Sequence, residues 1–111
     1  MRLTEQERGA VKVLRPEGPL RGDEAQEFKD RLVELADANG GRCVVDASAV
    51  QFVDSKGLEA LVDANEHILQ TGRPLKLCGV NEIVRQVLDL TELSSEFEYY
   101  ANVNAAVRSF L

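Results

Sequence analysis

Short apolar segments alternate with amphipathic segments along most of this chain, and this alternation constrains the fold more than any other feature. Three apolar runs of strand length are each followed by apolar residues at helical spacing; the runs are residues 42–46, 75–78 and 97–100. Two strand-like segments, residues 3–8 and 10–14, precede them with Gly9 between and predict a hairpin. This order predicts an α/β fold with a mixed β-sheet, an N-terminal hairpin followed by parallel strands, with helices packed against it.

The length of the chain and its charge narrow the range of functions. A chain of 111 residues is the size of one ordinary domain, so we expect a single domain over residues 1–111. Its net charge of −6 argues against binding to nucleic acid or to anionic membrane surfaces. No apolar run approaches the ~20 residues of a membrane-spanning helix, and no secretory leader is visible. We therefore expect a cytoplasmic protein that binds protein partners or small ligands.

The cysteine and histidine content indicates neither a metal centre nor a cofactor. Cys43 and Cys78 lie in apolar strand-like runs, which predicts small buried thiols in a reduced compartment, with a disulfide as the lesser alternative. The chain has one histidine and no C-x-x-C pair, so no metal-ligand cluster is expected.

Three local patterns give specific expectations for the ends and faces of elements. Asp23 is expected to cap a helix over residues 23–38. The proline-rich loop that begins at Pro16 is expected to stop the second strand, because proline cannot continue a ladder. In a helix over residues 81–90, capped by Asn81, apolar residues including Ile83 are expected to face inward.

The segment most informative for function is the polar loop that precedes the second helix. Ser55 lies at the expected start of this helix, where the simplest interpretation is that its hydroxyl caps the free N–H groups of the first turn. The same helix start favours an anion, so a phosphate on Ser55 is compatible with the fold. Such a phosphate adds about −1.5 to −2 charge, which alters a docking surface rather than the core.

A role for Ser55 as a hydrolytic nucleophile is the least supported interpretation. Val53 stands where the G-x-S-x-G pattern requires glycine. The single histidine, His67, lies twelve residues further along the same helix, about 18 Å away at 1.5 Å per residue. Asp46 either pairs with Asp54 across the loop, as a two-carboxylate metal site would require, or caps Ser48.

The residues around Ser55 resemble the signature of the STAS domain, the fold of bacterial anti-sigma factor antagonists. The motif is a buried strand followed by Asp-Ser-x-Gly-Leu at a helix start, here Val44-Val45-Asp46 and then Phe52-Val53-Asp54-Ser55-Lys56-Gly57-Leu58. The likeness extends along the chain through Pro16-Glu17-Gly18-Pro19-Leu20, Leu75-Lys76-Leu77-Cys78-Gly79-Val80, Val84-Arg85-Gln86-Val87-Leu88 and Leu90-Thr91-Glu92-Leu93.

The resemblance implies a non-enzymatic module that switches partners. Its serine, here Ser55, would be phosphorylated by an anti-sigma factor that is also a serine kinase, and a PP2C-type phosphatase would restore it. The unphosphorylated form would sequester the kinase and free the sigma factor. The residues implied in partner binding are Asp54, Ser55, Lys56, Gly57, Arg21 and Asp23.

Three residues depart from the family pattern. Lys56 follows the phosphoacceptor where serine or threonine is usual, Arg21 replaces an aspartate, and Glu92 replaces a glycine. Lys56 and Arg21 would make the pocket more basic, and we hypothesise that they partly neutralise a phosphate on Ser55 or hold another anion.

Two alternatives remain beside the phosphorylation switch and the hydrolase. One is a scaffold of the same fold without phosphorylation, in a lipid-transport or sensory complex. The other is a small-ligand site near Asp54, for which Gly57 alone is a poor phosphate cradle. The charged edge strand favours a monomer.

Overall fold

The computed structural model describes all 111 residues and contains one mixed sheet of five strands in the order β1-β2-β3-β4-β5. The hairpin strands β1 (Arg2–Arg8) and β2 (Val11–Glu17) are antiparallel. The next strands, β3 (Cys43–Asp46), β4 (Lys76–Cys78) and β5 (Glu98–Tyr100), each pair in parallel with the one before. The predicted α/β fold with a mixed sheet is confirmed.

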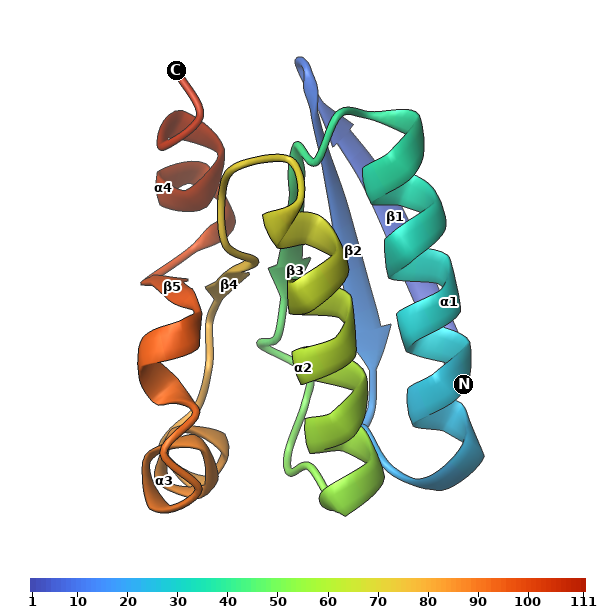
Figure 1. Cartoon of the computed structure of the whole chain (residues 1–111), viewed down its shortest axis with the longest axis vertical. Coiled ribbons are helices and arrows are strands. Elements are labelled where there is room, and N and C mark those ends of the chain that lie inside the picture. Colours follow the sequence, from blue (N-terminus) through green and yellow to red (C-terminus); the bar gives the residue numbers. More distant parts are fainter.

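Helices cover both faces of this sheet unequally (Figure 1). The long helices α1 (Gly22–Ala38) and α2 (Ser55–Leu69) lie side by side on one face. The short helix α4 (Val103–Arg108) covers part of the other face, and α3 (Glu82–Leu90) lies at the end of the sheet where the parallel strands finish. A 3₁₀ turn, η1 (Ser94–Glu96), precedes β5. None of these helices combines the length and apolarity needed to cross a membrane.

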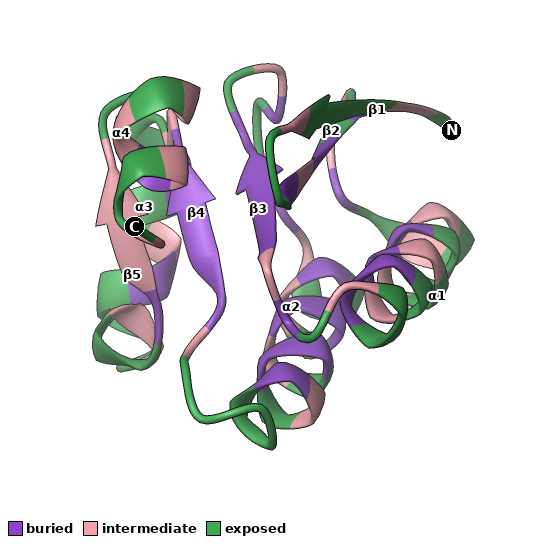
Figure 2. Ribbon diagram, turned by 90° about the horizontal axis from the view of Figure 1, so that it is seen from above, coloured by how far each residue is buried: buried purple, intermediate pink, exposed green.

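The main hydrophobic core lies between the sheet and the pair α1 and α2. Phe28 and Leu32 of α1 are fully buried there against central strands that are themselves buried, as Figure 2 shows. Burial of each such side chain contributes about 1.5–3 kcal/mol. A smaller cluster under α4 contains Val13, Val44 and Ala106. These two cores fix the sheet and so the ends of its strands.

Both cysteines are buried and unbonded, as expected for free thiols. Burial raises the pKa of Cys43 to about 11 and that of Cys78 to about 12. Both thiols therefore stay protonated and unreactive at neutral pH.

Three local expectations are wrong. The strand β2 continues through Pro16 to Glu17, because past Leu14 it is paired on one side only and proline is tolerated there. The helix α1 begins at Gly22 with Arg21 at its N-cap position, so Asp23 lies in the first turn and caps nothing. Ile83 is 59% exposed, and the face of α3 that packs inward buries only Val84 and Leu88.

Candidate functional site

The candidate site lies at the end of the sheet where the parallel strands finish, between the starts of α1 and α2. Two loops meet there through a parallel bridge between Leu20 and Val53. The Leu20 N–H donates to the Phe52 carbonyl (3.1 Å), and the Asp54 N–H donates to the Leu20 carbonyl (3.2 Å). These bonds hold the segment that carries Arg21 against the segment that carries Ser55. The ends of parallel strands are the usual place for a site in an α/β fold.

Asp54 links the starts of the two helices through its carboxylate. Oδ1 accepts a hydrogen bond from the Gly57 N–H (2.8 Å), which makes Asp54 the N-cap of α2. Oδ2 accepts from the Gly22 N–H (3.0 Å) at the first residue of α1. The Gly57 bond is the main cause that lowers the pKa of Asp54, and the Gly22 bond lowers it further. Asp54 is therefore a charged acceptor shared by both helices.

Gly57 allows α2 to approach the other loop closely. A Cβ atom built at Gly57 would lie 2.2 Å from the Leu20 carbonyl oxygen, far inside van der Waals contact. Because that oxygen belongs to the backbone and already accepts from Asp54, it cannot move aside freely. Gly57 is buried, and its contribution to the site is this close approach.

Ser55 is the first residue of α2, and it is exposed to solvent. The interpretation that its hydroxyl caps the helix is wrong, because the side-chain cap is Asp54. The Ser55 hydroxyl is therefore free of that structural task. The Asp54 carboxylate already accepts from the Gly57 N–H at the start of α2. Not all of the N–H groups of the first turn are therefore free to bind a phosphate.

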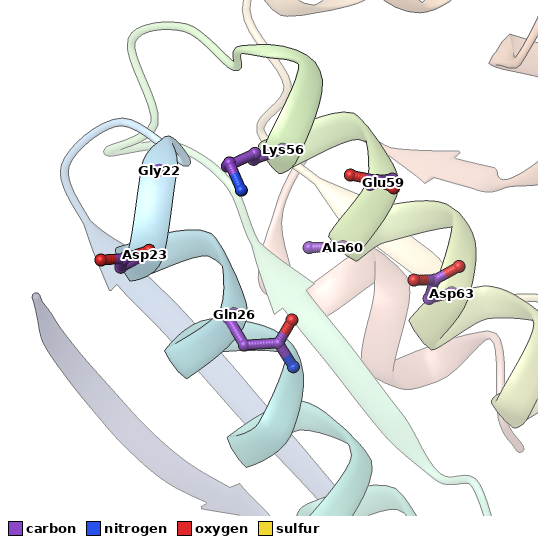
Figure 3. A pocket seen from close by; sticks show the side chains of 7 residues that line it. All are labelled: Gly22, Asp23, Gln26, Lys56, Glu59, Ala60 and Asp63. Carbon is purple, nitrogen blue, oxygen red and sulfur yellow. The ribbon is translucent and has the colours of Figure 1, made fainter.

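The structure brings Arg21, Asp23 and Lys56 to the same end of the molecule as Ser55. The Arg21 guanidinium carbon lies 5.9 Å from the centre of the Phe52 ring. Lys56 and Asp23 line opposite sides of a cleft of about 240 Å³ between α1 and α2. In Figure 3 the Lys56 side chain points toward the space between the two helices. Asp23, Glu59 and Asp63 supply the carboxylates of this cleft.

Two other polar residues that the sequence singled out lie apart from Ser55. Asp46 accepts from the Ser48 N–H (3.1 Å) and lies 3.7 Å from the Arg15 guanidinium, so it caps its own turn and does not pair with Asp54. His67 lies in the last turn of α2, and its Nε2 lies 2.6 Å from Oδ1 of Asp37 in α1. The serine and the histidine therefore lie at opposite ends of one helix.

Sequence reasoning missed Gly22 and Phe52. Gly22 acts through its backbone N–H, which no side-chain pattern reveals. Phe52 is 40% exposed, although its position between Val50 and Val53 suggests a buried residue. The only signal available was its place in the loop directly before Asp54.

Comparisons with known proteins identify the family of this chain. A model of the STAS domain family matches residues 2–106. The chain therefore belongs to the STAS domain family.

Solved structures of the same fold include three relevant proteins. TM1081 of Thermotoga maritima is 24% identical, with a TM-score of 0.87 over 96% of this chain and 92% of that chain. An anti-sigma factor antagonist from Mycobacterium paratuberculosis is 22% identical, with a TM-score of 0.82 over 97% and 92%. The anti-sigma factor antagonist SpoIIAA in its unphosphorylated form is 13% identical, with a TM-score of 0.77 over 98% and 96%. At these identities the likeness shows the fold. No curated protein matches the chain in a sequence search.

Proposed function

We propose that this chain is an anti-sigma factor antagonist whose partner binding is switched by phosphorylation of Ser55. In its unphosphorylated form it sequesters an anti-sigma factor that is also a serine kinase, which frees the sigma factor. Phosphorylation of Ser55 releases the kinase, and a PP2C-type phosphatase reverses the modification. The chain acts in the bacterial cytoplasm as a binding module, not as an enzyme.

The observation that supports this proposal is that Asp54 and Ser55 have separate roles at the start of α2. Asp54 caps α2, and Ser55 stands exposed beside it with no part in that cap. A kinase can therefore modify the hydroxyl without removing a bond that holds the helix. SpoIIAA, which shares the fold, is known in a phosphorylated form.

The effect of the phosphate follows from its surroundings. It adds about −1.5 to −2 charge next to the carboxylate of Asp54 and near Arg21 and Lys56. Because Ser55 is exposed, the core packing under α2 is unaffected, while the electrostatic potential of the docking surface becomes more negative. Arg21 and Lys56 partly neutralise the phosphate.

Incubation with a cognate kinase-type anti-sigma factor, ATP and magnesium tests the proposal. Peptide mapping by mass spectrometry should find one phosphate, on Ser55, and none in the Ser55→Ala variant. A phosphate on another residue, or no phosphate at all, would contradict it. Unchanged binding of a Ser55→Asp variant to the kinase would instead support a scaffold without a switch.

A further inference from the structure

Lys76 is a buried lysine of β4 that takes no part in the candidate site. It is 6% exposed, and its ammonium group donates to Ser109 Oγ (2.7 Å) and lies 3.3 Å from a carboxylate oxygen of Glu98. The same nitrogen lies 4.2 Å from the centre of the Phe110 ring and 5.4 Å from the centre of the Tyr100 ring. Lysine is rarely buried to this degree unless such partners surround it.

These partners come from two different parts of the chain. Glu98 lies directly opposite Lys76 in the pairing of β4 with β5, so this contact stays within the sheet. Ser109 and Phe110 instead belong to the stretch of residues 103–111, called here the α4 segment, which comprises α4 and the turn that follows it. Lys76 therefore ties the α4 segment to the sheet through a buried cation.

Apolar packing holds the α4 segment only weakly. Ala106 is the one buried residue among the six of α4, whereas α1 buries five of its seventeen. A helix as short as α4 is marginal on its own in water. Three further apolar side chains of the segment are partly buried, namely Val103, Val107 and Phe110. One other tie is a hydrogen bond from Arg8 of β1 to Asn104.

The α4 segment covers an apolar cluster that is separate from the main core. This cluster consists of Val11, Val13, Val44, Cys78 and Ala106, and none of them belongs to the cluster under α1 and α2. A segment that rests on its own small cluster can open without unfolding the rest of the chain. The two cysteines lie on different sides of this division, with Cys43 in the main core and Cys78 under the α4 segment.

We propose that the α4 segment is a cover that opens separately from the rest of the fold, and that Lys76 is the positioning residue that holds it closed. Opening separates Ser109 and Phe110 from the Lys76 ammonium group. It also exposes the Cys78 thiol and the valines that share its cluster, so a second face of the sheet becomes accessible.

This cover is independent of the proposed switch. In Figure 1 the α4 segment lies at the opposite end of the molecule from the start of α2, where Ser55 is found. Ser109 and Phe110 also lie beyond residues 2–106, the part of the chain that the family model matches. The contacts that close the cover therefore involve residues outside the family pattern.

The two cysteines provide an internal comparison, because a buried thiol reacts only when its surroundings open. Cys78 is 0% exposed and Cys43 is 2% exposed in the closed form. The folded full chain is incubated with excess N-ethylmaleimide at about pH 8, and peptide mass spectrometry follows each label with time. Cys78 should be labelled at least about ten-fold faster than Cys43, since only the α4 segment has to open.

Lys76→Met tests the role of the ammonium group, because methionine keeps most of the apolar stem and removes the charge. We expect it to raise the labelling rate of Cys78 about ten-fold and to leave that of Cys43 unchanged. Lys29→Met is a matched control, since Lys29 forms an ion pair between α1 and α2. It should change neither rate.

Ser109→Ala provides a second test should Lys76→Met fail to fold. It removes the acceptor of the Lys76 hydrogen bond at a residue that is itself exposed. Amide hydrogen exchange of residues 103–110 should accelerate in Ser109→Ala and in Lys76→Met, while exchange within α1 stays as it is in the unaltered chain.

Equal labelling rates of the two thiols in the unaltered chain would overturn the inference, because both would then react only on global unfolding. Faster labelling of Cys43 would also overturn it. So would a Lys76→Met chain in which Cys78 reacts more slowly, or no faster than in Lys29→Met. No kinase takes part in these measurements, so their failure is distinguishable from an absence of phosphate on Ser55.

Discussion

The Gly22 N–H lies 3.0 Å from Oδ2 of Asp54, so the first helix donates a hydrogen bond to a residue 32 positions away that also caps the second helix. One carboxylate therefore fixes the relative position of two helix starts. This relationship leaves the neighbouring Ser55 hydroxyl outside the helix cap, and it makes the geometry of the site sensitive to Asp54.

Replacement of Asp54 by alanine should destabilise the fold, because two backbone N–H groups lose a charged acceptor. We expect the midpoint of thermal unfolding to fall by roughly 5 °C or more. Ser55→Ala, one residue away, should melt within about 1 °C of the unmodified chain, since Ser55 takes no part in the cap. If the midpoint of thermal unfolding fell equally in the two variants, Asp54 could not be the residue that caps α2.

The contribution of Asp54 to the stability of the folded chain should depend on pH in a predictable direction. Its hydrogen bonds lower its pKa from the ordinary value of 3.8, so the folded chain binds this proton more weakly than the unfolded chain does. The stabilisation is complete above the ordinary pKa and is lost as the pH falls through the lowered value. Urea unfolding of the chain and of Asp54→Asn from pH 7 to about pH 2 measures this. The difference between them should shrink toward the acid end, and a difference that grew would contradict the assignment.

Gly57→Ala reverses the usual effect of removing a glycine from a helix. In an ordinary helix the change stabilises by about 0.5–1 kcal/mol. Here the added Cβ would lie 2.2 Å from the Leu20 carbonyl oxygen, so we expect a loss of about 1–3 kcal/mol. Chemical denaturation provides the measurement, and any gain in stability would show that α2 can move away from the loop at little cost.

Glu92 adopts a conformation that favours glycine. Its φ angle is 60°, and it follows α3 in a turn where the Leu93 N–H donates to the Leu88 carbonyl (2.9 Å) and the Glu92 N–H donates to the Asp89 carbonyl (3.1 Å). This Schellman turn usually has glycine at the left-handed position. Glu92→Gly should therefore stabilise the chain by about 0.5–1 kcal/mol, and Glu92→Ala should not. A loss with glycine, measured by the same denaturation, would contradict this account.

The fold was predictable because its signal is local and repeated. The spacing of Phe28, Leu32 and Leu35 in α1 follows from the need to bury one helix face, and the apolar run Cys43–Val45 follows from a strand covered on both sides. These patterns can be recognised in the sequence without knowing which strands pair with one another or in what register.

The errors at Asp23 and Pro16 arose where a contact joins segments distant in the sequence. Asp23 is the natural N-cap by local pattern, yet the acceptor for the start of α1 comes from Asp54. The local pattern predicts that Pro16 ends a strand, but this rule depends on whether a neighbouring strand needs an N–H donor at that position, and β3 pairs with β2 only as far as Leu14. Ile83 has the spacing of an inward-facing apolar residue, yet the short helix α3 buries only Val84 and Leu88.

Calorimetric titration of the purified kinase-type anti-sigma factor with the two forms of this chain tests the central claim most directly. The account predicts that the unmodified chain binds, and that the chain with one phosphate on Ser55 binds at least about a hundred-fold more weakly, as expected when a desolvated charge faces like charge. Equal affinity of the two forms would contradict the claim that Ser55 is the switch.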